Sequence, residues 1–245
     1  MMRCGPISTL SVCLLSRLLL SMSYDVARAK PLTSEESELY YTMGVRMSTD
    51  LAIYDLSPEA IDKITEGLKD GHRGALKLDP GPVFDRLKAH LMRLVDQRAA
   101  EESTKGHAFF KVFQAKPGVK MSPRGAAYLI SKEGTGRTPT RKEVVQVHYE
   151  GRTVDGVIFD SSRARTSSGV AKPVPFPLDQ VVPCWTDVLP LIKEGSRVQL
   201  VCPSQLAYGK RGAPPIIPPG ATLVFDIEFF RIGLKQTEKE RKRLR

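Results

Sequence analysis

The stretch LAYGKRGAPPIIPPGATLVFDIEFF, residues 206–230, carries the strongest structural signal in the chain. Its first half is a loop rich in proline and glycine, and its second half alternates apolar and polar residues, as a half-buried β-strand does. In residues 222–230 this alternation places four large apolar side chains on one face: Leu223, Phe225, Ile227 and Phe229. The stretch therefore predicts a long strand that enters a sheet directly after a tight loop.

Two further segments of the same half alternate in the same way. They are VVQVHYEG, residues 144–151, and RVQLVC, residues 197–202. One short helix is expected between these segments, from Trp185 to about Ile192, and Pro190 should end it early. Strands with one helix and many Pro and Gly turns predict an α+β domain, with an antiparallel sheet covered on one face.

The N-terminal half shows helical signals instead. Residues 33–36, TSEE, form a capping box ahead of an apolar stripe that recurs every four residues: Leu39, Met43, Met47 and Leu51. Ser57-Pro58 is a second start signal, and Asp70-Gly71 is expected to end that helix. A third helix is expected after residues 79–82, DPGP, and it reaches about Phe113 if Gly106 does not break it.

Three short amphipathic helices form a thin core on their own, so their apolar stripes need a partner. A second copy of the chain would make this half a dimerisation module. The alternative is a helical cap that folds back on the C-terminal half of its own chain. The stripes alone leave both interpretations open.

Residues 1–29 are expected to be a signal peptide. An apolar run follows Arg3, and Ala27-Arg28-Ala29 offers small residues at both positions that signal peptidase favours. Cleavage after Ala29 would send the chain to the secretory lumen, the periplasm or the exterior. After this segment no run of about 18 apolar residues occurs, so no transmembrane segment is expected.

The formal charge of +10 does not by itself indicate a nucleic-acid partner. Residues 235–245, KQTEKERKRLR, hold six basic and two acidic residues, and a solvated basic tail is the simplest interpretation. Two of the four cysteines lie in the expected signal peptide, and Cys184 and Cys202 remain. Two cysteines are too few for a disulfide scaffold, so we expect two buried free thiols.

The residues of conventional catalysis are scarce. The four histidines show no metal-ligand spacing with Cys, Asp or Glu, so no metal is expected. Glu133-Gly-Thr-Gly136 lies in a loop that does not support phosphate binding, and no cofactor is expected. What the C-terminal half offers is a set of aromatics near strand ends and turns that could line one apolar pocket beside Asp160: Tyr149, Phe159, Trp185, Tyr208 and Phe225.

Four segments in this order resemble the FKBP family of peptidyl-prolyl cis/trans isomerases: VHYEG (147–151), GVIFDSSRAR (156–165), VVPCW (181–185) and residues 206–230. Upstream, YTMGVRMSTDL (41–51) and AFFKVFQAKPGVKMSPRGAAYLI (108–130) are similar to the macrophage infectivity potentiator subfamily. The resemblance implies an antiparallel half-barrel sheet wrapped on one short helix, preceded by an all-helical domain. The expected divisions are a signal peptide (1–29), a helical dimerisation domain (30–115), an isomerase domain (116–234) and a basic tail (235–245).

By position, the resemblance assigns catalytic pocket roles to Tyr149, Phe159, Asp160, Trp185, Tyr208 and Phe225, with Trp185 as the floor. It assigns substrate binding to Val174, Val181, Val182 and Ile216. Val174 stands where many members carry an aromatic residue, so that wall should be thinner. The expected partners are proline-containing polypeptides, macrolides of the rapamycin or tacrolimus type, and a second copy of the chain. A module that binds proline segments, or holds unfolded chains, without turnover is the alternative.

Overall fold

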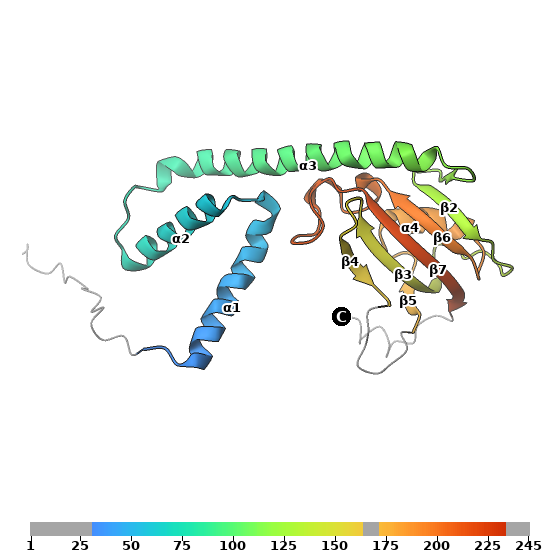
Figure 1. The fold of residues 1–245 in the computed structure, drawn as a ribbon, viewed down its shortest axis with the longest axis horizontal. Helices are drawn as coiled ribbons and strands as arrows, with labels where there is room; N and C mark the ends of the chain where they lie inside the picture. The colour runs from blue at the N-terminus through green and yellow to red at the C-terminus, as the bar shows by residue number, and fades with distance from the viewer. Residues whose placement is uncertain (1–30, 164–171, 234–245) are drawn as a thin grey trace, which may run out of the picture.

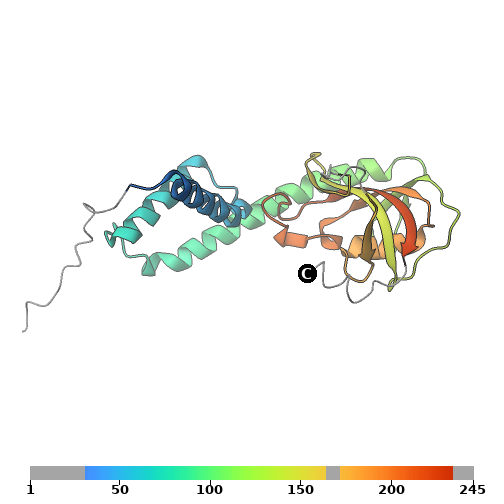
Figure 2. The ribbon, with the colours of Figure 1, turned by 90° about the horizontal axis from the view of Figure 1, so that it is seen from below.

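The computed structural model describes residues 31–163 and 172–233, and it combines a helical half with a sheet half. The expected signal peptide and basic tail lie outside the described residues. One long helix, α3, runs along the top of Figure 1 and reaches from the helical half onto the sheet half, which Figure 2 shows from below. None of the helices in the described ranges is long and apolar enough to cross a membrane.

The helix starts follow the predicted capping signals. Helix α1 spans Ser34–Leu51, and its capping box is formed: the Thr33 hydroxyl accepts the Glu36 N–H at 3.1 Å, while the Glu36 carboxylate accepts the Thr33 N–H at 2.9 Å. Helix α2 spans Pro58–Arg73 and starts at the predicted Ser57 cap. It ends three residues later than predicted, because Gly74 rather than Gly71 takes the left-handed conformation, with φ of 67°.

Helix α3 spans Phe84–Gln114 without interruption. Gly106 does not break it, and this glycine lies where the helix packs against Thr222 of the sheet half. Short 3-10 turns join the three helices: η2 (Ala52–Tyr54) follows α1, and η3 (Gly81–Val83) precedes α3.

Within the described residues the sheet has seven antiparallel strands in the order β1-β2-β6-β7-β3-β4, with β5 paired to β3. Its strands are β1 (Lys120–Met121), β2 (Ala127–Lys132), β3 (Val144–Thr153), β4 (Ile158–Ser161), β5 (Val174–Pro177), β6 (Arg197–Cys202) and β7 (Leu223–Gly233). The three strands predicted from alternation are β3, β6 and β7, and they lie side by side at the centre of the sheet. The α+β class and the covering helix are confirmed.

The covering helix α4 spans Pro183–Val188, two residues earlier than predicted, and continues as the 3-10 turn η4 (Leu189–Leu191). Pro183 takes the first helical position, where its missing N–H costs nothing. The main core lies between α4 and one face of the sheet. Two further 3-10 turns, η5 (Ser204–Leu206) and η6 (Gly209–Arg211), shape the loop between β6 and β7.

The prediction of two free thiols is wrong, because Cys184 and Cys202 form a disulfide across a Cα–Cα distance of 5.7 Å. The bond joins the first turn of α4 to the end of β6. Both residues are fully buried in the main core, where the fold brings them together.

A second, smaller core joins α3 to the opposite face of the sheet. Phe113 of α3 is 1% exposed and packs with Ala127, Val201 and Val224. These strand residues alternate with neighbours in the main core, so they point to the other side of the sheet. The boundary expected between residues 115 and 116 would therefore separate Phe113 from the sheet residues on which it packs.

Candidate active site in an aromatic pocket

An aromatic pocket of about 310 Å³ opens between the sheet and α4. Its residues come from β3, β4, β5, α4 and its leading loop, the loop after β6, and β7. The lining consists of Tyr149, Phe159, Asp160, Phe176, Gln180, Val181, Val182, Trp185, Tyr208 and Phe225. All six residues predicted to be catalytic therefore meet in one cavity.

Trp185 forms the floor of this pocket and is 3% exposed. Three aromatic rings meet its indole edge to face, with centroid distances of 5.5 Å to Tyr149, 5.5 Å to Phe176 and 5.4 Å to Phe225. Edge-to-face packing is the favoured arrangement of aromatic pairs and holds each ring in one orientation. The floor is thus a rigid apolar surface with the shape set by four interlocking rings.

Two phenols, one carboxylate and the amide of Gln180 are the polar side chains of the lining. The Tyr149 hydroxyl donates a hydrogen bond to the Asp160 carboxylate at 2.5 Å. Burial raises the pKa of Tyr149 above its usual range, and the hydrogen bond to Asp160 raises it further. Burial, followed by the charge of Asp160, also raises the pKa of Tyr208. Both phenols therefore remain protonated donors at neutral pH, and the Asp160 carboxylate braces Tyr149.

Gly151 makes room for this arrangement. It pairs with Phe225 in the register of β3 and β7. A Cβ atom at this position would lie 2.6 Å from Cζ of Phe159 and 2.9 Å from Cε1 of Phe225. The two rings, which pack edge to face at 5.7 Å, therefore occupy space that any side chain at residue 151 would need.

The residues predicted for substrate binding divide into two groups. Val181 and Val182 line the pocket, and Val182 also caps α4. Val174 packs against the main core and pairs with Val147, and Ile216 is 45% exposed, so neither belongs to the lining. Their expected pocket positions are not found.

Phe176 and Gln180 line the pocket but were not predicted. Phe176 lies two residues beyond Val174 on β5 and therefore points to the same face of that strand. This alternation along the strand could have predicted Phe176 as a pocket residue once Val174 had been proposed as one. The wall that Val174 was expected to leave thin is occupied by the Phe176 ring, which packs on both Tyr149 and Trp185.

The residues that line the pocket include no Ser, Thr, Cys, Lys or His. Within the described residues, no three His, Cys, Asp or Glu side chains gather closely enough to hold a metal ion. What the arrangement provides is a buried aromatic floor, two phenol donors, one amide and one braced carboxylate. Such a site can bind a compact apolar ring and a carbonyl group, and can exclude water from both.

Comparison with known proteins gives matches over both halves. Residues 135–230 match the model of the FKBP-type peptidyl-prolyl cis-trans isomerase domain, and residues 36–130 match the domain amino terminal to it. The chain is 32% identical over 225 residues to the outer membrane protein MIP of Legionella longbeachae, which covers 88% of this chain and 93% of that protein.

Two other relatives are named FkpA. A probable isomerase of this name from Neisseria meningitidis is 47% identical over 138 residues, which cover 56% of this chain and 48% of that protein. The chain thus spans about half the length of this relative. The crystal structure of FkpA from Escherichia coli is 30% identical, has a TM-score of 0.56, and matches 83% of this chain and 99% of that one. The combination of these matches with the fold shows that the chain belongs to the family of FKBP-type peptidyl-prolyl cis-trans isomerases.

Proposed function

We propose that this protein catalyses the cis/trans isomerisation of X–Pro bonds in polypeptides that fold outside the cytoplasm. The observation that carries the proposal is the pocket itself, in which Trp185, Phe225 and Tyr208 surround a space suited to a pyrrolidine ring. The chain's membership in the isomerase family supports the same reaction.

The pocket can accelerate this reaction without a nucleophile. Resonance holds the prolyl amide planar, with a rotation barrier of about 18–20 kcal/mol. The planar amide is more charge-separated than the twisted one, so water stabilises it better, and the dry aromatic floor removes this advantage. A thousandfold rate gain requires a barrier lower by only about 4 kcal/mol. Contacts that Trp185 and Phe225 make to the ring while the carbonyl rotates would supply part of it.

Isomerisation of a short X–Pro peptide by residues 30–245 tests this function. We expect catalysis, a preference for an apolar residue before proline, and inhibition by a macrolide such as rapamycin, because the walls are aromatic and aliphatic. A rate equal to the uncatalysed one, with macrolide binding retained, would favour a non-catalytic binding module instead. Loss of both would reject the pocket as a proline site.

An oxidising compartment fits the disulfide. Disulfides persist in secreted, periplasmic and luminal proteins and are rare in the cytosol. The buried bond between Cys184 and Cys202, the apolar N-terminal segment and the similarity to a protein named for the outer membrane support the same location. Fractionation of cells that express the full chain, with N-terminal sequencing of the product, would test both export and cleavage after Ala29.

We further propose that the helical half forms a homodimer. No residue of α1 or α2 is buried, and Leu39, Met43 and Leu68 are each more than half exposed. Figure 1 shows α1 projecting away from α3, and Phe84, Leu87 and Met92 form an exposed apolar face on α3.

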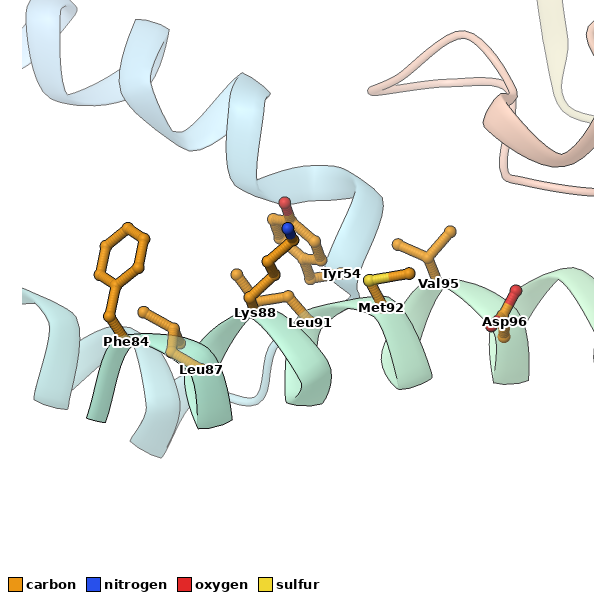
Figure 3. A pocket seen from close by; sticks show the side chains of 8 residues that line it. All are labelled: Tyr54, Phe84, Leu87, Lys88, Leu91, Met92, Val95 and Asp96. Carbon is orange, nitrogen blue, oxygen red and sulfur yellow. The ribbon is translucent and has the colours of Figure 1, made fainter. Parts of the chain in front are cut away.

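That face of α3 carries a groove of about 400 Å³. In Figure 3 the side chains of Phe84, Leu87 and Met92 stand along α3, and Tyr54 reaches toward them from η2. Phe84 and Met92 are 66% and 59% exposed. Exposed apolar surfaces of this kind mark protein interfaces, and a second copy offers equally unpartnered α1 and α2 helices to cover it.

A further inference from the structure

The C-terminal half of α3 packs so closely against the sheet half that the contact leaves room only for glycine at some positions. Ala99, Glu102 and Gly106 are buried although most of this helix is exposed. A Cβ atom at Gly106 would lie 2.2 Å from Oγ1 and 2.8 Å from Cβ of Thr222. The Thr222 Cβ is attached directly to the backbone and cannot rotate away, so this contact requires glycine.

A second glycine, Gly220 in the loop before β7, makes a similarly close contact with the backbone of Ala99 in α3. Gly220 has φ of 76°, and a Cβ atom there would lie 2.5 Å from the carbonyl oxygen and 2.9 Å from the Cα of Ala99. The helix and the loop therefore touch backbone to backbone between Ala99 and Gly220, and two residues later the Thr222 side chain lies against the backbone of Gly106. Glycines on both partners allow this approach and leave no space between them.

The loop held in this way carries pocket residues. The Gly220 N–H donates a hydrogen bond to the carbonyl oxygen of Gly209 at 2.9 Å, and Gly209 directly follows Tyr208. Thr222 directly precedes β7, which carries Phe225. The contact with α3 thus fixes the loop next to two of the pocket's aromatic walls.

An ionic contact joins the same face of α3 to the turn between β3 and β4, which leads to further pocket residues. Lys105 reaches Glu102 at 2.8 Å and Asp155 at 3.6 Å. Asp155 lies in the turn between β3 and β4, and β4 carries Phe159 and Asp160. The helix therefore contacts the turn before β4 as well as the loop before β7.

We propose that residues 99–106 of α3 are a positioning element of the isomerase: they set the places of Tyr208 and Phe225 without touching the substrate. None of these helix residues lines the pocket. Because α3 continues into the helical half, the element also links the geometry of the pocket to the part of the chain proposed to dimerise. The effect on turnover rests on the isomerase function proposed above.

Gly106→Ala in the full chain tests the proposal, with Gly67→Ala as its matched control. Gly67 is also a helical glycine, but an added Cβ there would meet nothing within 4 Å. A displacement of about 1 Å in a catalytic site costs up to about a hundredfold in rate, so Gly106→Ala should lower kcat by about ten- to a hundredfold with a smaller change in KM. Gly67→Ala should leave both constants unchanged. All rates are measured at a temperature at which unfolding curves show each variant folded.

Rescue and hydrogen exchange separate positioning from simple destabilisation. Gly106→Ala combined with Thr222→Gly removes the clash and should recover turnover relative to Gly106→Ala alone. The Gly220 amide should exchange faster in Gly106→Ala than in Gly67→Ala. Equal kcat in the two single variants, or equal exchange of this amide, would overturn the proposal. A wild-type chain without turnover would reject the isomerase function, and the exchange comparison would still decide whether α3 positions the loop.

Discussion

At the scale of single residues, the pocket depends as much on an absent side chain as on the aromatic ones. Gly151 lies opposite Phe225 in the sheet, and the rings of Phe159 and Phe225 fill the space above it. Both rings line the pocket, and Phe225 packs directly on Trp185. A methyl group at residue 151 would therefore displace these two rings and change the shape of the pocket.

Gly151→Ala should lower kcat/KM by about tenfold or more, because the displaced Phe159 and Phe225 rings no longer fit the substrate. Gly233→Ala is the control, since a Cβ atom at that glycine of β7 would meet its nearest neighbours at an ordinary 3.6 Å. Peptide isomerisation by both variants gives the comparison. Equal kcat/KM in the two variants would show that the rings adjust without cost.

The buried phenol of Tyr149 predicts a dependence of stability on alkaline pH. The pKa of Tyr149 is raised by burial and by Asp160, so the folded state holds this proton more tightly than the unfolded state does. The stabilisation is fully present below the ordinary tyrosine pKa of about 10 and is lost as pH rises above it. Denaturant unfolding between pH 8 and 11 should show a smaller loss of unfolding free energy for Tyr149→Phe than for the wild type. An equally steep loss in both proteins would contradict this assignment.

The six catalytic candidates could be named from the sequence because they stand in segments that resemble the FKBP family, which assigns pocket roles to these positions. Val174 and Ile216 could not be excluded in the same way. Both lie in or near pocket segments, and only the folded structure shows that Phe176 lines the pocket in place of Val174 and that Ile216 is 45% exposed outside the lining. Gly151 was not predicted, because its close approach to Phe159 and Phe225 on neighbouring strands leaves no recognisable pattern in the sequence of any one strand.

At the scale of elements, the disulfide fixes α4 to β6. Cys184 directly precedes Trp185 on α4, and Cys202 ends β6, just before the loop that carries Tyr208. The bond therefore ties the floor of the pocket to the strand that leads into one of its walls. Residue spacing could not predict the pairing, because the condition for it is the approach of two Cα atoms that only the folded core provides.

Replacing both cysteines by alanine should lower the free energy of unfolding by about 3 kcal/mol, the value typical of a disulfide that closes a loop of this size. The sequence separation of the two residues is 18. Urea unfolding of wild type and variant measures the difference, and reductant should have no effect on the variant. Alkylation of the folded wild type without reductant should leave both cysteines unlabelled; two labelled cysteines would restore the free-thiol interpretation.

Helix α3 is the element that the sequence described least well. Its start and its length follow from the DPGP turn and the apolar stripe. Its attachment to the sheet half does not, because Ala99 and Gly106 are small residues that give no amphipathic signal. An isomerase fragment that begins at Lys116 loses Phe113 and the whole positioning face. A fragment that begins near Asp96 keeps both, so it is the better choice for separating the two halves.

At the scale of the whole molecule, Figure 1 shows helices α1 and α2 at one end and the sheet half, which holds the aromatic pocket, at the other. Two pockets linked through a dimer would raise the effective concentration of a client chain that binds both. If the proposed dimer forms, α1 and α2 should therefore affect turnover of unfolded protein clients more than turnover of short peptides.

Light scattering of residues 30–245 should give the mass of a dimer, and Met43→Lys should shift it toward the monomer. Met43 is 55% exposed in a single copy, so a charge there matters only if a partner covers it. Thr42→Lys adds the same charge one residue away on the same helix and should leave the dimer intact. A monomeric wild type at tens of micromolar, or equal masses for the two variants, would contradict the proposed interface.

The most direct test of the central claim compares two phenylalanines on the same strand. Phe225 is 4% exposed in the pocket, whereas Phe230, five residues further along β7, is 55% exposed and lies outside it. Peptide isomerisation should be measured for wild type, Phe225→Ala and Phe230→Ala, with folding of each verified by its unfolding curve. We predict that Phe225→Ala loses most of the catalysed rate while Phe230→Ala keeps the wild-type kcat/KM. Wild-type turnover in folded Phe225→Ala would contradict the assignment of this pocket as the site of catalysis.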